Sequence, residues 1–331
     1  MACALCPRAC EADRVRSLGF CGESWELRIA SAVIHRGEEP PICGSGGSGA
    51  IFITGCNLGC PFCQNIQISQ HGLGRTVGTE EFAEICLALE RAGAENINLV
   101  TGSHAACALA AGIRRARSTG LSIPVLWNSS GYENNAILDS LEGLIDIYLP
   151  DLKTVDRELS ARFFDAPDYP DFAASAILRM VAHTPLRYGL GAGALASGVI
   201  VRHLVIPGCL DSTRDVFRWF RDNCQGRALF SIMTQYTPMP QRPEDAWRGI
   251  PNRHLDESEY EAILEWIEEF EIEEGFYQEL VIDREWLPDF SRTNPFPARQ
   301  SSPGELPNEA PDEPPGEPLA TAVWHWQDGF V

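Results

Sequence analysis

Three cysteines of this 331-residue chain lie close together in the spacing C-x3-C-x2-C, at Cys56, Cys60 and Cys63. Three thiolates within one short loop can converge on a soft inorganic centre. Gly55 and Gly59 give the loop the backbone freedom that this convergence needs. A structural zinc site takes four protein ligands, and no good fourth ligand stands nearby. The spacing therefore indicates a [4Fe-4S] cluster with three cysteine ligands and one open iron, rather than a chance group of buried cysteines.

Four further cysteines precede this loop in a segment that is too short to form a hydrophobic core of its own. A bound metal would supply the folding energy that the segment otherwise lacks. Structural zinc and an auxiliary iron–sulfur cluster are both consistent with the spacing, and free reduced thiols are a third alternative. The candidate ligands are Cys3, Cys6, Cys10 and Cys21. The remaining five cysteines stand singly and are expected to be packing residues.

The elements that must position the loop alternate between strand-like and helix-like segments. Apolar runs predict strands near 50–54, 96–100, 123–127, 144–149, 199–205 and 228–233. Helical spacing lies between most of them, near 79–92, 104–118, 133–141, 172–183 and 212–223. Parallel strands need long crossover connections, so this alternation predicts an α/β fold with a parallel sheet. The strands are apolar throughout, as expected when both faces of the sheet are covered.

Four blocks of this sequence resemble the radical SAM superfamily, in the branch related to pyruvate formate-lyase activating enzymes. The cysteine block is highly specific for the superfamily. The other three blocks indicate an activase-like subfamily but no particular reaction. Together the resemblance covers about residues 1–290. The blocks are Thr54–Asn65, Asp146–Lys153, Arg202–Gly208 and Gln235–Pro240.

The resemblance implies a partial (β/α)6 barrel over residues 46–290. A cysteine-rich N-terminal extension, residues 1–45, would precede it, and a Pro-rich acidic tail with an aromatic end, residues 291–331, would follow. Cys56, Cys60 and Cys63 would hold the [4Fe-4S] cluster, whose open iron chelates S-adenosylmethionine (SAM). One electron from a donor such as flavodoxin or ferredoxin would cleave SAM to methionine and a 5′-deoxyadenosyl radical, which abstracts hydrogen from the substrate.

In such a barrel the ends of the strands handle the cofactor. Thr101-Gly102-Ser103-His104 stands where the activases carry a Gly-Gly-Glu segment. The backbone of Gly102 and Ser103 matches this segment, but the acid that meets the methionine amino group is absent. His104 is either a proton donor or a helix-cap residue.

Short polar residues follow the third predicted strand at Asn128 and Ser129. Related enzymes contact the ribose or the carboxylate of SAM at this place, although a turn with a helix cap explains the same residue types. Phe62, the aromatic residue of the cysteine loop, joins this cofactor-binding set by resemblance.

Asp151 and Lys153 follow the fourth predicted strand and lie on one side of an extended chain, because side chains alternate along a strand. Lys153 is the single lysine among 26 cationic residues. By resemblance it pairs with the methionine carboxylate of SAM, and lysine and arginine are not interchangeable in such a role. The alternative is an ordinary surface ion pair.

Arg202 and His203 on the fifth predicted strand must point to opposite faces, and Arg202 matches the activase position better. Thr237 occupies the place of a histidine that the activases carry after the next strand. The role of that histidine in the activases is therefore not assigned to Thr237.

The formal net charge of −20 is concentrated near the C-terminus. Residues 1–243 hold 24 acids against 21 bases, whereas residues 244–290 hold 16 acids against 3 bases. A near-neutral body without a basic stripe argues against a nucleic-acid partner. The acidic stretch 256–274 predicts an amphipathic helix with Asp256 as N-cap and Glu259 completing a capping box.

No secretory signal and no apolar run of membrane-spanning length is found. We therefore expect a cytoplasmic protein without a membrane partner, in which disulfides are rare. The leading hypothesis is a radical SAM enzyme that abstracts hydrogen from a protein or peptide, including the glycine of a glycyl radical enzyme. One alternative is radical modification of a small molecule or side chain. The other is a non-catalytic iron–sulfur or zinc redox protein.

Overall fold

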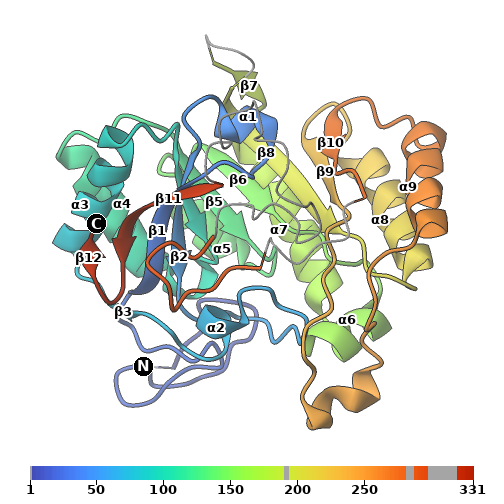
Figure 1. Cartoon of the computed structure of the whole chain (residues 1–331), viewed down its shortest axis with the longest axis horizontal. Coiled ribbons are helices and arrows are strands. Elements are labelled where there is room, and N and C mark those ends of the chain that lie inside the picture. Colours follow the sequence, from blue (N-terminus) through green and yellow to red (C-terminus); the bar gives the residue numbers. More distant parts are fainter. Residues whose placement is uncertain (1, 190–193, 281–286, 297–318) are drawn as a thin grey trace, which may run out of the picture.

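A twisted sheet runs through the centre of the protein, with helices packed outside it (Figure 1). The computed structural model describes residues 2–189, 194–280, 287–296 and 319–331. All six predicted strands are present, and a further short strand, β10, extends the parallel part of the sheet. The predicted α/β class with a partial (β/α)6 barrel is confirmed. In spatial order the parallel strands are β2 (Ser48–Ile53), β4 (Ile97–Val100), β5 (Val125–Ser129), β6 (Ile147–Pro150), β8 (Leu195–Leu204), β9 (Leu229–Met233) and β10 (Gly275–Tyr277).

The crossover helices lie close to their predicted positions, because each has an apolar face to bury against the sheet. One helix, α6, was not predicted; it stands between β6 and α7 with Asp156 as its N-cap. No helix in the described part of the chain is both long and apolar enough to cross a membrane. The helices are α3 (Thr79–Arg91), α4 (Ala106–Ser118), α5 (Asn135–Ser140), α6 (Arg157–Phe164), α7 (Tyr169–His183) and α8 (Leu210–Asn223), with 3-10 turns η1 (Ser103–Ala105) and η2 (Pro243–Arg248).

The N-terminal extension is irregular only as far as Leu27. The next residues form β1 (Arg28–His35), which pairs antiparallel with β2 so that His35 lies opposite Ser48, the first residue of β2. A short helix, α1 (Pro40–Cys43), follows at the opposite end of the sheet from α2 (Ile66–Ser69) (Figure 1). The chain therefore reaches the amino ends of the barrel strands before it enters the barrel.

The aromatic end of the chain docks on the body. There β11 (Ala320–His325) pairs with β1, and β12 (Gly329–Phe330) with β11. Trp324 is fully buried, and its indole nitrogen donates to a Glu81 carboxylate oxygen at 3.2 Å. The proline-rich stretch 297–318 lies outside the described residues. Two minor strands, β3 (Arg75–Thr76) and β7 (Arg187–Tyr188), pair with β1 and β8.

The acidic helix is α9 (Glu257–Glu269), with the predicted capping box between Asp256 and Glu259. Ile263 and Phe270 are buried against the body. On the same apolar stripe, Tyr260, Leu264 and Ile267 are only half-buried.

Candidate functional site

The cysteine loop begins immediately after β2, at the carboxyl ends of the parallel strands. Gly55 has φ +87°, and a Cβ atom there would lie 2.7 Å from the Cys21 carbonyl oxygen. Only glycine fits this conformation and this close approach. Downstream in the loop, the Leu58 amide donates a hydrogen bond to the Cys56 sulfur at 3.4 Å. Such N–H···S contacts stabilise thiolates that bind iron.

The three loop thiols have a donor chemistry that suits an iron–sulfur cluster. Burial raises the pKa of the Cys56 thiol, and it raises the pKa of Cys60 to about 12 although the Lys153 ammonium opposes this shift. At neutral pH a metal must therefore displace the proton before these sulfurs become ligands. In the described residues no three His, Cys, Asp or Glu side chains converge to hold a single metal ion. Cluster ligands need not converge in this way, because each cysteine binds a different iron.

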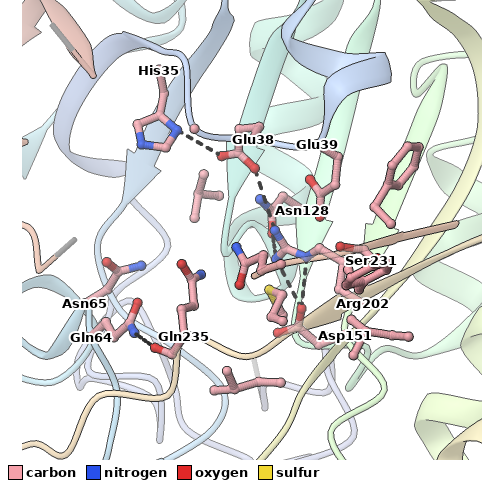
Figure 2. A pocket seen from close by; sticks show the side chains of 18 of the residues that line it. His35, Glu38, Glu39, Gln64, Asn65, Asn128, Asp151, Arg202, Ser231 and Gln235 are labelled. Carbon is pink, nitrogen blue, oxygen red and sulfur yellow. Dashed lines mark hydrogen bonds and ion pairs between the residues drawn. The ribbon is translucent and has the colours of Figure 1, made fainter. Parts of the chain in front are cut away.

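A cavity of about 640 Å³ lies inside the barrel, next to the cysteine loop (Figure 2). Four predicted site residues line it: Asn128, Asp151, Lys153 and Arg202. The Lys153 ammonium donates to one Asp151 oxygen at 2.7 Å, and the Arg202 guanidinium donates to the other at 3.1 Å. Arg202 also donates to the Asn128 side-chain oxygen at 2.6 Å.

The Asp151–Lys153 pair is not an ordinary surface pair, because its side chains are only 16% and 19% exposed. The two cations hold the pKa of the Asp151 carboxyl below its usual range despite burial. The pair is therefore charged and presents an ammonium group beside the cysteine loop.

The other end of the cavity is formed by residues that the sequence patterns did not single out. His35, Glu38 and Glu39 come from the end of β1 and the loop before α1 (Figure 2). Glu38 lies 3.8 Å from an Arg202 nitrogen, and His35 lies 3.7 Å from Glu38. Burial lowers the pKa of His35 to about 4, so its ring is neutral.

Further polar residues of the lining include Gln64, Asn65, Ser231 and Gln235. Gln64 donates to the Gln235 carbonyl at 3.2 Å and ties the cysteine loop to the segment after β9. Both glutamines lie inside sequence blocks that resemble the known family. Their place in these blocks was the only sequence feature that could have identified them as site residues. The sequence offered no signal for Glu38 and Glu39, because their loop belongs to the N-terminal extension that precedes the predicted barrel.

Four predicted cofactor-binding residues are not part of the cavity lining that the structure describes. The Phe62 ring packs on the rings of Phe163, Phe164 and Tyr236, with centroids 5.5 to 6.0 Å apart. Gly102 packs closely against Trp127, because a Cβ atom at Gly102 would lie only 2.8 Å from the Trp127 ring.

The other two of these residues are serines whose hydroxyl groups have partners inside the protein. Ser103 donates to the buried Glu133 carboxylate at 2.7 Å, and Ser129 accepts from the Gly131 amide at 3.2 Å, as in a turn. Their cofactor roles, like those of Phe62 and Gly102, stay predictions.

Two histidines near the barrel mouth have structural contacts. His104 bonds to the Thr54 carbonyl at 2.7 Å, and burial lowers its pKa to about 4, so it is neutral. His203 is buried on the face opposite Arg202 and contacts the Leu152 carbonyl and the Thr213 hydroxyl. As expected from strand geometry, only Arg202 of the two neighbours lines the cavity.

The four N-terminal cysteines gather next to the cysteine loop. The Cys10 and Cys3 side chains are hydrogen-bonded, and a Cβ atom on Gly19 would lie 3.3 Å from the Cys21 sulfur and 3.5 Å from the Cys10 sulfur. Burial raises the pKa of the Cys6 thiol to about 11, and the nearby Cys21 and Cys3 thiols add to this effect.

The partial barrel carries three thiols at the carboxyl end of its first parallel strand, which defines an α/β barrel protein with a cysteine loop at the barrel mouth. The family model described as "Radical SAM superfamily" matches residues 50–181. An uncharacterized protein of Methanocaldococcus jannaschii is 30% identical over 281 residues, which cover 82% of this chain and 75% of that protein. The chain belongs to the radical SAM superfamily, whose members use SAM and a [4Fe-4S] cluster.

Solved structures with similarity include a radical SAM methyltransferase from Sphaerobacter thermophilus, with TM-score 0.49 and 15% identity over 70% of this chain and 66% of that one. SuiB from Streptococcus suis bound to S-adenosylmethionine has TM-score 0.48 and 12% identity over 68% of this chain. This chain spans about half of SuiB, 48% of its length. A domain of a pyruvate-formate lyase-activating enzyme from Bacteroides vulgatus has TM-score 0.37 and 11% identity over 52% of this chain and 89% of that domain.

Proposed function

We propose that Cys56, Cys60 and Cys63 hold a [4Fe-4S] cluster at which SAM is reductively cleaved, and that the protein abstracts hydrogen from a protein or peptide. When bound, the cluster supplies one electron that splits SAM into methionine and a 5′-deoxyadenosyl radical, which takes a hydrogen atom from the substrate. The observation that carries this proposal is the buried Asp151–Lys153 pair that faces the cavity beside the loop.

The chain's own residues have distinct tasks in this proposal. Lys153 offers its ammonium group to the methionine carboxylate of SAM, and Asp151 orients that group through the 2.7 Å hydrogen bond. Arg202 holds Asp151 and Asn128 in place. Gln64 and Gln235 close the cavity wall next to the loop and help to keep water out.

The substrate class has two candidates. Resemblance to activating enzymes supports a protein or peptide, including the glycine of a glycyl radical enzyme. The cavity of about 640 Å³ favours a small molecule or a single side chain, because small-molecule pockets fall in this size range. A flavodoxin or ferredoxin as electron donor and a cytoplasmic location belong to the same proposal, since the cluster requires reduced thiols.

The test is anaerobic reconstitution with iron and sulfide, followed by reduction with SAM present and quantification of 5′-deoxyadenosine. We expect the parent protein to form at least one equivalent of 5′-deoxyadenosine per protein chain. Cys60→Ala should form none above background. Cys107→Ser is the matched control, because Cys107 is exposed on α4. A cluster-loaded parent that makes no 5′-deoxyadenosine would refute the enzyme and favour the non-catalytic redox protein.

We also propose that Cys3, Cys6, Cys10 and Cys21 bind a second metal centre. Apart from a single bridge between Ala2 and Asp13, residues 2–27 contain no regular secondary structure, so their fold depends on other contacts. Structural zinc and an auxiliary iron–sulfur cluster both suit four cysteine thiols, so the metal analysis must separate them.

Iron, sulfide and zinc analysis of a Cys3→Ala, Cys6→Ala variant tests the second centre. We expect the variant to lose the metal of this centre while the loop cluster and SAM binding remain. A fall in iron by about the content of one cluster would assign an iron–sulfur centre. Loss of one zinc instead would assign a zinc site. Unchanged metal content would leave these cysteines as free thiols and overturn the proposal.

A further inference from the structure

Glu38 and Glu39 enter the cavity from the loop between β1 and α1. Pro40 follows directly, and a residue before proline avoids the helical region, so Glu39 is extended, with φ −57° and ψ 141°. This conformation precedes α1 and carries the acidic pair into the barrel rather than out to solvent (Figure 2). Two carboxyl groups are thus buried at the end of the cavity that lies away from the cysteine loop.

The hydrogen-bonding capacity of this acidic pair is only partly used within the described residues, where Ser231 hydrogen-bonds to the Glu39 carboxyl group. One Glu39 oxygen, Oε2, is buried and has no hydrogen-bond partner there. The Glu38 contacts, 3.7 Å to His35 and 3.8 Å to Arg202, are too long for hydrogen bonds. Buried carboxylates without close donors are costly, so this arrangement points to a ligand that supplies donors.

The charges that line the cavity do not balance. Three acids face it, Glu38, Glu39 and Asp151, against two bases, Lys153 and Arg202. Both bases make their short hydrogen bonds to Asp151, and Arg202 makes its remaining short one to Asn128. His35 adds no positive charge, because burial keeps its ring neutral. Among the described lining residues, the count of acids and bases therefore leaves one acid without a base at the Glu38–Glu39 end. Burial raises the pKa of both carboxyl groups, and Arg202 opposes this shift, so a cation bound beside them would favour their ionised form.

We propose that Glu38 and Glu39 bind a cationic nitrogen of the substrate, a primary ammonium or a guanidinium group. The identification of this ligand as the substrate rests on the proposed function. The existence of the cation site does not depend on it. The free oxygen of Glu39 accepts from the nitrogen, and Glu38 adds a second carboxylate within the same pocket. The nitrogen is then anchored away from the cysteine loop, so that a carbon elsewhere in the substrate lies close to the loop. The substrate class is a compound or side chain with a cationic end, such as a lysine or arginine side chain.

SAM also carries an ammonium group, so the same chemistry has a second source. Two features favour the substrate. Glu38 and Glu39 enter from the amino ends of the strands, since His35 lies opposite the first residue of β2. The cysteine loop and Lys153 lie at the carboxyl ends, where SAM would bind. The experiment must nevertheless separate the two sources.

The test measures binding to the anaerobically reconstituted protein by calorimetry, with SAM present. The probes are N-acetyl-lysine methylamide and its neutral analogue N-acetyl-norleucine methylamide, which lacks the ammonium. We expect the lysine probe to bind at least about 10-fold more tightly, as typical for a buried charge-assisted contact. Glu39→Gln should abolish this preference, while Glu84→Gln, an exposed acid on α3, should keep it.

Equal iron content and thermal midpoint of Glu39→Gln and the parent show that the variant is folded. Equal binding of the two probes to the parent, or no binding of either, overturns the cation site. The cation site is also overturned if both Glu39→Gln and Glu38→Gln still bind the lysine probe more tightly than the norleucine probe. A drop in SAM affinity with the probe preference unchanged assigns the pair to SAM instead. If the preference holds but the parent makes no 5′-deoxyadenosine, the cation site stands and the proposed function fails.

Discussion

The two cysteine-bearing segments of this protein are built in different ways. The loop that carries Cys56 starts directly from β2, so the sheet sets its position. Residues 2–27 lack such a frame and are held by backbone hydrogen bonds within turns and by side chains that bind backbone carbonyls. Arg14 is buried and donates to the carbonyls of Glu23, Ser24 and His104. A sheet can thus position ligands through its strands, whereas an irregular segment depends on individual turns and polar contacts.

The two segments nevertheless touch. The Cys56 amide donates to the Cys21 carbonyl at 3.3 Å, and Arg8 donates to the Asn57 carbonyl at 2.8 Å. Damage to the N-terminal segment should therefore weaken the loop, but less than damage to the loop itself.

The largest effect is expected for Cys60→Ala. Loss of one of three ligands should lower 5′-deoxyadenosine formation by about 100-fold or more, since even outer contacts of metal sites cost 10- to 100-fold. Iron bound by the N-terminal cysteines should remain. Complete loss of iron from both segments would show that they form one unit and would break the comparison. Cys86→Ala, a buried packing residue on α3, serves as the control.

The next largest effect is expected where the segments meet, at Gly55. Gly55→Ala must adopt φ +87° and would approach the Cys21 carbonyl to 2.7 Å. We expect the free energy of unfolding to fall by about 2 kcal/mol or more, with loss of cluster iron. Gly59→Ala is the matched control in the same loop, because nothing lies within 4 Å of its Cβ position. Equal stability of the two variants in urea unfolding would contradict the close contact.

Arg14→Met tests the frame of the N-terminal segment. It keeps the apolar stem of the side chain but removes the guanidinium group, so three carbonyls lose their donor, and those of Glu23 and His104 are buried. This should lower the free energy of unfolding by about 1–3 kcal/mol. Arg16→Met, at a side chain that is 87% exposed, should change stability by less than about 0.5 kcal/mol. Thermal unfolding of both variants checks this difference. A similar small effect at both positions would mean that the metal alone holds the segment.

The smallest effect is expected for Lys153→Arg, which keeps the charge but changes its shape. We expect SAM affinity to fall by about 10-fold with the iron content unchanged, because a guanidinium does not fit the place of a compact ammonium. Equilibrium binding of SAM to the reconstituted protein measures this. Unchanged affinity would reduce Lys153 to an ion-pair partner of Asp151.

Much of the fold could be predicted because the barrel strands are short apolar runs separated by helical spacing. β1 escaped prediction because its small residues Ala30, Ser31 and Ala32 follow a cysteine-rich stretch and give no strong apolar signal. β11 pairs with β1 across nearly 300 residues of chain, and no local pattern reports such a distant pairing.

The candidate site could be predicted where it depends on strand ends. Asp151, Lys153 and Arg202 meet in the cavity because parallel strands place their carboxyl ends together. Phe62 and Ser129 were predicted by resemblance, yet their side chains contact protein groups outside the cavity lining. Glu38 and Glu39 could not be predicted, because their position depends on how an N-terminal loop packs against the amino ends of the barrel strands.

Electron paramagnetic resonance of the reduced, reconstituted protein tests the central claim most directly. If Cys56, Cys60 and Cys63 leave one iron of a [4Fe-4S] cluster open, SAM must bind that iron and change the spectrum of the reduced cluster. We expect a SAM-dependent change in the parent and in the Cys3→Ala, Cys6→Ala variant, and none in Cys60→Ala. A cluster-loaded parent whose spectrum is the same with and without SAM would contradict the claim.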